Sequence, residues 1–215
     1  MMNDLFEHET TGEFERIGAG AMVLRGFALP FVPELLRGVD ALAQQVDFRK
    51  PITPGGFTMS AASINCGVLG WTSDRHGYKY RSVDPTSGQP WPAMPPSFSA
   101  LATQAADAAG YPHFEPDACL VNQYVPGARM SLHQDKNERD FDAPIVSVSL
   151  GISAMFLFGG LTRTDKTTKI PLFHGDVVVW GGVDRLRFHG VMPIKDHPHS
   201  LLGSQRINLT FRRAG

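Results

Sequence analysis

The segment RINLTFR, from Arg206 to Arg212, alternates polar and apolar side chains at every position. This alternation predicts a β-strand with its polar residues on one face and its apolar residues on the other. A series of short runs with strand composition precedes it, separated by turns rich in Gly and Pro. These runs are Cys119 to Val125, Arg129 to His133, Ile145 to Leu150, Ala154 to Phe158, Lys169 to Phe173, Val177 to Trp180 and Leu186 to Val191. The last strand, which contains RINLTFR, is expected to run from Arg206 to Arg213. Together they predict a mostly β protein built as a double-sheet jelly roll, an arrangement that leaves no long bare strand edges.

Two helices are expected to flank these strands. Pro33 to Val46 places its Leu and Val residues on one stripe at helical period, with a proline in the first turn. A second helix is expected from Ser97 to Ala109, with Ser97 as its N-cap. Between the helices lie a predicted strand from Phe57 to Ile64 and a Pro-rich loop from Asp84 to Pro96. This middle region is irregular, polar and aromatic, as a lid over a site would be.

Composition limits the broad class of protein. The chain has 215 residues, of which 42% are hydrophobic and 19% charged, and this is ordinary for one soluble globular domain. No run approaches the ~18 apolar residues that a membrane span needs, so no membrane association is expected. The formal net charge of −1 argues against a globally basic nucleic-acid coat. Any polyanion must therefore bind to a local patch.

The cysteines and the N-terminus suggest a compartment. Cys66 and Cys119 belong to no paired metal spacing, which fits a reducing environment where buried thiols stay free. The stretch from Met1 to Arg16 is rich in acidic residues and has no apolar run, so it matches neither a signal peptide nor a transit sequence. A cytoplasmic protein is expected.

A metal centre is indicated by His133-Gln134-Asp135 together with His189. Residues two apart at a strand end point to the same side, so His133 and Asp135 can bind one ion as a pair. Two His and one carboxylate on one face of an octahedral ion leave three positions open. This arrangement suits non-haem Fe(II) that accepts a chelating co-substrate and dioxygen together, and it favours oxidative chemistry over hydrolysis.

The polar face of Arg206 to Arg212 carries two guanidiniums and an amide. Buried arginine is costly unless it is paired, and no run of acidic residues in the sequence matches this face. A dicarboxylate ligand is the simplest partner, because Arg binds carboxylates bidentately. The alternative is an edge strand with both arginines in solvent. Asn122 and Tyr124 show the same alternation, and they could contact the same ligand or belong to the core.

Two other histidine motifs have simpler interpretations. His174-Gly175-Asp176 lies between two apolar runs, so a hairpin turn in which Asp176 bonds the local backbone is favoured over a metal pair. His197 and His199 flank a proline in a polar stretch, which predicts a solvated loop.

The motifs NQYVPG at 122–127, HQDK at 133–136, His189 and RINLTFR at 206–212 together resemble the AlkB family of Fe(II)- and 2-oxoglutarate-dependent nucleic-acid dealkylases, its bacterial members most of all. The likeness runs from about Phe27 to Ala214. It includes TPGG at 53–56, NCG at 65–67, LGWT at 69–72 and GDVVVW at 175–180. The R-x-N-x-T-x-R run is far more specific than H-x-D.

The resemblance implies a fold and a domain plan. The fold is a double-stranded β-helix, which is a jelly roll, with flanking helices and an N-terminal nucleotide-recognition lid. One catalytic domain spans 1–215. Within it, 1–48 is an N-terminal extension and helix, 49–96 is the lid, and 97–215 is a helix followed by the dioxygenase core.

The resemblance also implies roles for individual residues. The iron ligands and catalytic centre are His133, Asp135 and His189. The residues around 2-oxoglutarate are Asn122, Tyr124, Arg206, Asn208 and Arg212. Trp71 stacks on a flipped base opposite His133, and the residues bordering the nucleotide are Thr53, Met59, Tyr78, Arg129, Lys136, Asn137 and Arg163. How Arg206 and Arg212 divide the two carboxylates is left open.

The implied activity is oxidative demethylation of N-alkylated bases in single-stranded or base-flipped DNA, with RNA as a second candidate substrate. It consumes 2-oxoglutarate and O2 at Fe(II), and it releases formaldehyde, succinate and CO2. A methyl group inside a duplex is out of reach of a cleft, so the base must be extruded or already unpaired. Alkylated DNA is the expected partner, with no obligate protein partner, and a monomer is expected.

Three alternatives stay open. The first is a 2-oxoglutarate oxygenase that hydroxylates a protein or a small molecule. The second is a non-catalytic lesion-binding module with a structural metal. A cupin-like metal-storage protein is third, and it leaves the polar face of Arg206 to Arg212 without a purpose.

One position departs from the family pattern. The family usually has an acidic residue two places after the Asp ligand, facing the base, whereas this chain has Asn137 there and Glu138 beside it. A carboxylate attracts a positively charged methylated base, and asparagine offers hydrogen bonds without charge. A weaker preference for cationic lesions is therefore expected.

Overall fold

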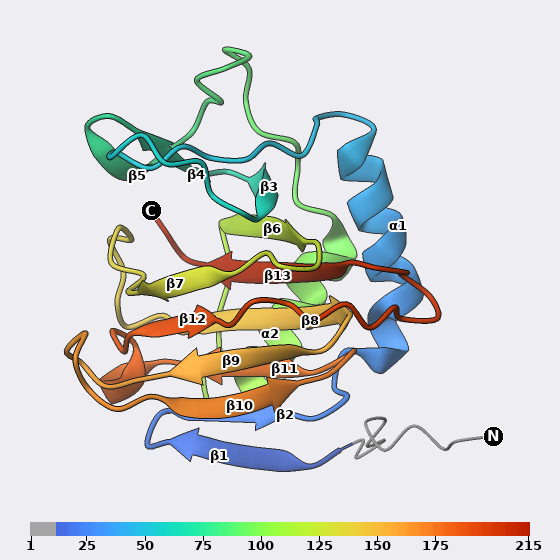
Figure 1. Cartoon of the computed structure of the whole chain (residues 1–215), viewed down its shortest axis with the longest axis vertical. Helices are drawn as coiled ribbons and strands as arrows, with labels where there is room; N and C mark the ends of the chain where they lie inside the picture. The colour runs from blue at the N-terminus through green and yellow to red at the C-terminus, as the bar shows by residue number, and fades with distance from the viewer. Residues whose placement is uncertain (1–11) are drawn as a thin grey trace.

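Two antiparallel β-sheets form the centre of this protein in the computed structural model, which describes residues 12–215 (Figure 1). The larger sheet has seven strands in the order β1-β2-β11-β8-β13-β6-β3, and the smaller has four in the order β10-β9-β12-β7. The expected jelly roll is confirmed. The N-terminal acidic stretch, Met1 to Arg16, lies mostly outside the described residues.

The strands of the larger sheet are β1 Phe14–Gly18, β2 Ala21–Leu24, β3 Ala62–Gly67, β6 Ala118–Tyr124, β8 Ile145–Gly151, β11 Val177–Trp180 and β13 Arg206–Arg212. Those of the smaller sheet are β7 Met130–His133, β9 Ala154–Phe158, β10 Thr168–Leu172 and β12 His189–Val191. A separate pair, β4 Gly70–Asp74 and β5 Gly77–Arg81, forms a hairpin within the predicted lid region, and it is called the lid hairpin below. The helices are α1 Val32–Ala43 and α2 Pro96–Ala108, with 3-10 turns at Leu29–Phe31 and Gly182–Asp184. In the described part of the chain, neither helix combines the length and apolar character that crossing a bilayer requires.

Two local predictions were wrong. The strand expected from Phe57 to Ile64 begins only at Ala62, and Phe57 lies in a loop with 76% of its surface exposed. Ser97 is not an N-cap, because the second helix already begins at Pro96 and no side chain caps it. Proline lacks the N–H that a cap would satisfy, so the first turn loses little.

The strand pattern did not predict the β1–β2 hairpin or the lid hairpin. β2 has four residues, and it becomes a sheet member by pairing along its whole length with β11. Asp176, at the turn before β11, binds this N-terminal part by accepting hydrogen bonds from Gly26 N at 2.9 Å and Arg25 Nη1 at 2.6 Å. Long-range pairing of this kind leaves little trace in a short sequence window.

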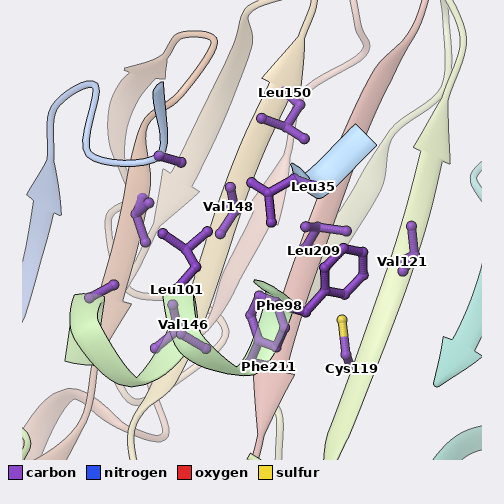
Figure 2. Packing of buried hydrophobic residues seen from close by; sticks show 14 of the residues in the cluster. Leu35, Phe98, Leu101, Cys119, Val121, Val146, Val148, Leu150, Leu209 and Phe211 are labelled. Atoms are coloured by element: carbon purple, nitrogen blue, oxygen red, sulfur yellow. The ribbon is translucent and has the colours of Figure 1, made fainter. Parts of the chain in front are cut away.

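The helices cover one face of the larger sheet. Apolar side chains of β8 and β13 point toward them, and Phe98 of α2 meets Phe211 edge to face with ring centroids 6.1 Å apart (Figure 2). Leu35 of α1 and Leu209 of β13 belong to the same buried cluster. Because successive side chains of a strand alternate, the polar residues of β13 must face the opposite side, between the two sheets.

A second buried cluster fills part of the space between the sheets. It includes Trp180, Phe156, Ile170 and Tyr124, contributed by both sheets. Trp180, Phe156 and Tyr124 also border a cavity that continues toward the lid hairpin. The second cluster therefore packs the two sheets against each other, and the cavity remains beside it between the sheets.

Candidate metal centre and adjoining cavity

Pairing of β7 with β12 brings the two predicted histidine ligands together. His133 lies directly opposite His189 in this antiparallel pair, and Asp135 follows just beyond the end of β7. His133 Nε2 is 3.7 Å from Asp135 Oδ1, and His189 Nε2 is 3.8 Å from Asp135 Oδ2. One ligand atom from each residue lies within 4.8 Å of the others. The three side chains can thus converge on a single ion.

Backbone carbonyls orient both imidazoles. Nδ1 of His133 lies 2.8 Å from the Ser131 carbonyl oxygen, and Nδ1 of His189 lies 3.0 Å from that of Arg187. A ring that donates from Nδ1 keeps the lone pair of Nε2 for a metal. Burial, followed by the neighbouring His133, lowers the pKa of His189 to about 4, so this ring is neutral at physiological pH. These features fit a divalent metal.

Asp135 is held as a carboxylate by a buried arginine. Burial alone would raise the pKa of Asp135, but Arg212 and the two histidines more than offset this effect and hold it well below its usual range. Arg212 donates to Asp135 Oδ2 from Nη2 at 2.7 Å and from Nε at 2.9 Å. Arg185 Nη1 donates to the backbone carbonyl of Asp135 at 2.8 Å. The carboxylate is therefore both charged and oriented.

Arg206 offers unused hydrogen-bond donors in the same cavity. Its residue surface is 1% exposed, and its Nη2 donates to Ser149 Oγ at 2.8 Å. Its Nε and Nη1 are buried, and nothing in residues 12–215 accepts a hydrogen bond from them. The guanidinium carbon lies 5.1 Å from the ring centroid of Tyr124. A buried guanidinium with two unused donors fits a carboxylate ligand, as 2-oxoglutarate would supply.

The two arginines of β13 therefore differ in what they can offer a ligand. Arg212 is committed to Asp135, whereas Arg206 is not paired with an acid in the described part of the chain. The side-chain amide donors of Asn208 are also used, because its Nδ2 donates to Ser147 Oγ at 2.8 Å and to the Val148 carbonyl at 2.9 Å. These hydrogen bonds join β13 to β8.

One cavity of about 720 Å³ connects these groups. Its lining includes the three candidate metal ligands and the five residues expected around 2-oxoglutarate. It also includes these residues expected near the nucleotide: Thr53, Met59, Trp71, Tyr78, Arg129, Asn137 and Arg163. Lys136 is the exception, because it is exposed and does not line the cavity. The structure therefore brings every other predicted site residue together.

The lid hairpin places two aromatic rings at the cavity. Trp71 of β4 and Tyr78 of β5 are stacked, with ring centroids 5.3 Å apart and planes 15° from parallel. Asn137 Nδ2 donates to the Tyr78 carbonyl at 3.2 Å. Its neighbour Glu138 does not line the cavity, so it does not stand in for the acidic residue that Asn137 replaces.

Several residues of the site escaped the sequence reasoning. Ser147 and Ser149 of β8 accept hydrogen bonds from Asn208 and Arg206, and the alternation of serine with apolar residues in this strand was a usable signal. Trp180 lies with its ring centroid 4.9 Å from that of His189. No local pattern marks this tryptophan, because only the face-to-face packing of the sheets brings it there.

The remaining histidine motifs lie apart from the metal centre. A turn does lie at His174-Gly175-Asp176, with Gly175 at φ 87° and Asp176 Oδ2 accepting from Phe173 N at 2.9 Å. The expected hairpin was wrong, because the strands on either side, β10 and β11, belong to different sheets and do not pair. His199 does not stand alone in its loop, because its ring centroid lies 4.3 Å from that of His174. The two motifs pack on each other.

The sequence of this chain matches a superfamily of oxygenases over most of its length. Residues 20–212 match the model of the 2OG-Fe(II) oxygenase superfamily. The chain is 55% identical over 214 residues to the alpha-ketoglutarate-dependent dioxygenase AlkB of Escherichia coli, covering 100% of this chain and 99% of that protein. It is 47% identical over 181 residues to the AlkB homologue of Caulobacter vibrioides, covering 84% of this chain and 80% of that protein.

A solved structure shares the fold. The structure of OsALKBH1 superposes with a TM-score of 0.81 at 29% sequence identity, covering 94% of this chain and 100% of that chain. Fe(II), 2-oxoglutarate and O2 are the metal and co-substrates of this superfamily, and the His-Asp-His cluster suits that metal. The chain belongs to the 2OG-Fe(II) oxygenase superfamily and, within it, to the AlkB family.

Proposed function

We propose that this protein is an Fe(II)- and 2-oxoglutarate-dependent dioxygenase that removes N-methyl groups from alkylated bases in DNA, with RNA as a second substrate. The observation that carries the proposal is the joint presence, in one cavity, of the His133-Asp135-His189 cluster and the two unused donors of Arg206. When bound, iron and 2-oxoglutarate supply the oxidation of a methyl C–H bond with O2. The products are formaldehyde, succinate, CO2 and the restored base.

The chain's own residues orient and shield these groups. Arg206 binds one carboxylate of the co-substrate through Nε and Nη1, while Tyr124 covers the guanidinium. Arg212 keeps Asp135 Oδ2 occupied, which leaves Oδ1 facing His133 for the metal. Burial between two sheets excludes bulk water, so each of these charge interactions is stronger than it would be in solvent.

The lid hairpin recognises the base. One face of Trp71 is already packed on Tyr78, and the base stacks on the other face, opposite His133. A base can reach this position only when it is unpaired or extruded. Aromatic recognition of this kind favours a nucleobase over a protein side chain or a small acid as the substrate.

Trp71→Ala is expected to lower kcat/KM for a methylated oligonucleotide by about 10- to 100-fold, because stacking contributes roughly 1 to 3 kcal/mol per base. The measurement is formaldehyde released from a single-stranded oligonucleotide that carries one N-methylated base. Succinate formed slowly without nucleic acid should be retained, since Trp71 touches neither the metal cluster nor Arg206.

Phe14→Ala is a matched aromatic control, because Phe14 of β1 is exposed and does not line the cavity. Full oligonucleotide demethylation by Trp71→Ala would favour the oxygenase that acts on another substrate. Tight binding of methylated DNA with no succinate formed, in the parent protein with Fe(II) and air, would support the lesion-binding module instead.

Asn137→Asp is expected to raise the preference for cationic lesions over neutral ones by about tenfold, because it adds a negative charge at the cavity wall. The effect stays moderate because residue 137 is exposed, so solvent screens the new charge. The measurement is the ratio of kcat/KM for 1-methyladenine to that for a neutral N-methylated base. An unchanged ratio would show that residue 137 does not read lesion charge.

Three finer points complete the proposal. The protein acts as a monomer in the cytoplasm, and its two buried free cysteines agree with a reducing compartment. The nucleotide-recognition lid corresponds to 49–96, although its β3 strand pairs with β6 in the larger sheet. The catalytic core corresponds to 97–215, with 1–48 supplying a hairpin and helix that complete it.

A further inference from the structure

A chain of buried polar contacts leads from the candidate metal ligand Asp135 to the lid hairpin. Arg212, which holds Asp135, also lies with its Nε 3.4 Å from Glu138 Oε1. The same oxygen of Glu138 accepts a hydrogen bond from the Tyr80 hydroxyl at 2.8 Å. Tyr80 belongs to β5 and lies directly opposite Trp71 in the hairpin register.

Glu138 also reaches the second arginine that holds Asp135. Its Oε2 lies 3.4 Å from Nη2 of Arg185, whose Nη1 binds the Asp135 carbonyl. The Glu138 side chain is 2% exposed. A carboxylate so buried persists only with close partners, and here these are two arginines and one phenol. The two acids and two arginines form a charge-balanced group behind the metal cluster.

We propose that Glu138 is a positioning residue that couples the Asp135 carboxylate to the lid hairpin, through Arg212 on one side and the Tyr80 hydroxyl on the other. The inference rests on the metal site proposed above. A divalent cation at Asp135 competes with Arg212 for the charge of that carboxylate. Among the described residues, Glu138 is the other carboxylate that pairs with Arg212, so the Arg212–Glu138 ion pair strengthens when the cation binds. The stronger ion pair fixes Glu138 Oε1, which accepts the hydrogen bond from the Tyr80 hydroxyl.

The consequence is reciprocal. If a cation at Asp135 stabilises the hairpin through this chain, then an intact Tyr80 contact must strengthen cation binding by the same factor. The hairpin carries Trp71, so metal occupancy would set the position of the ring proposed to stack on the base. A lid without such a link would respond to nucleic acid alone.

The test uses the full chain with Mn(II) alone, without 2-oxoglutarate or nucleic acid. The two readouts are the Mn(II) Kd by calorimetry and the hydrogen exchange of amides in residues 70–81 with and without Mn(II). In the parent, Mn(II) should slow exchange in the hairpin. Tyr80→Phe should lose this metal-dependent protection and raise the Kd roughly fivefold. Glu138→Gln should raise the Kd by about tenfold, because it weakens the support of a ligand.

Tyr111→Phe is the matched control, since it removes one tyrosine hydrogen bond, to the Gly20 carbonyl at 2.7 Å, elsewhere in the fold. It should leave both readouts unchanged. If Glu138→Gln fails to fold, the Mn(II) Kd and the hydrogen exchange of Tyr80→Phe still test the inference. Parent-like Kd and protection in Tyr80→Phe, or equal losses in Tyr111→Phe, would overturn this inference and leave the proposed function standing. Failure of the parent to bind Mn(II) would overturn both.

Discussion

His189→Ala is expected to abolish the visible absorption band that Fe(II) and 2-oxoglutarate give when both are bound, and with it demethylation. His189 supplies one of only two imidazoles in the candidate cluster, and its Nδ1 is already committed to the Arg187 carbonyl. Residues that merely support a metal ligand contribute about 10- to 100-fold in affinity, so a direct ligand should contribute more. We expect kcat/KM to fall by on the order of 10³ or more.

The measurement is an anaerobic Fe(II) titration in the presence of 2-oxoglutarate, followed by formaldehyde release in air. His174→Ala is the matched control, because His174 is another partly buried histidine that packs on His199, away from the cluster. It should retain the band. A His189→Ala protein with the parent's band would mean that the iron binds elsewhere, and the site assignment would be wrong.

The strands that follow Ala118 were predictable because each buried face leaves a period-two pattern. β9 and β11 match their predicted bounds, and β13 differs by one residue at its end. β12 is shorter than expected, since Gly182–Asp184 forms a 3-10 turn that takes the chain into the sheet only at His189. The lid hairpin escaped prediction because its five-residue strands pair only with each other, and the residues that they bury, Gly70 and Thr72, give no apolar alternation.

The residues of the site were predictable as types, whereas their partners were not. The alternation of β13 identified Arg206 and Arg212 as one polar face, but it could not show that one binds Asp135 and the other does not. The difference arises because the loop after β7 carries Asp135 to Arg212 and not to Arg206. Such a contact depends on how distant segments pack, which a short stretch of sequence does not show. The Glu138–Tyr80 contact joins a loop to the lid hairpin in the same way.

The second large effect concerns Arg206, and it separates binding from stability. Arg206→Met is expected to raise the KM for 2-oxoglutarate by roughly 10²-fold or more, because truncating one side of a buried charged contact costs about 2 to 5 kcal/mol. The free energy of unfolding without ligand should stay within about 1 kcal/mol of the parent, since Arg206 is unpaired with any acid in the described residues and methionine fills similar volume.

Arg212→Met is the matched comparison on the same strand face. It leaves the buried Asp135 carboxylate without its arginine and Glu138 with Arg185 alone, so it should lower the free energy of unfolding by about 3 to 5 kcal/mol. Urea denaturation of both variants and steady-state kinetics with varied 2-oxoglutarate provide the measurements. Equal destabilisation by the two variants, with the KM of Arg206→Met unchanged, would make Arg206 a structural residue. Retained stability of Arg206→Met with a raised KM would mean that Arg206 serves to bind 2-oxoglutarate, because a buried guanidinium without an acidic partner does not stabilise the fold.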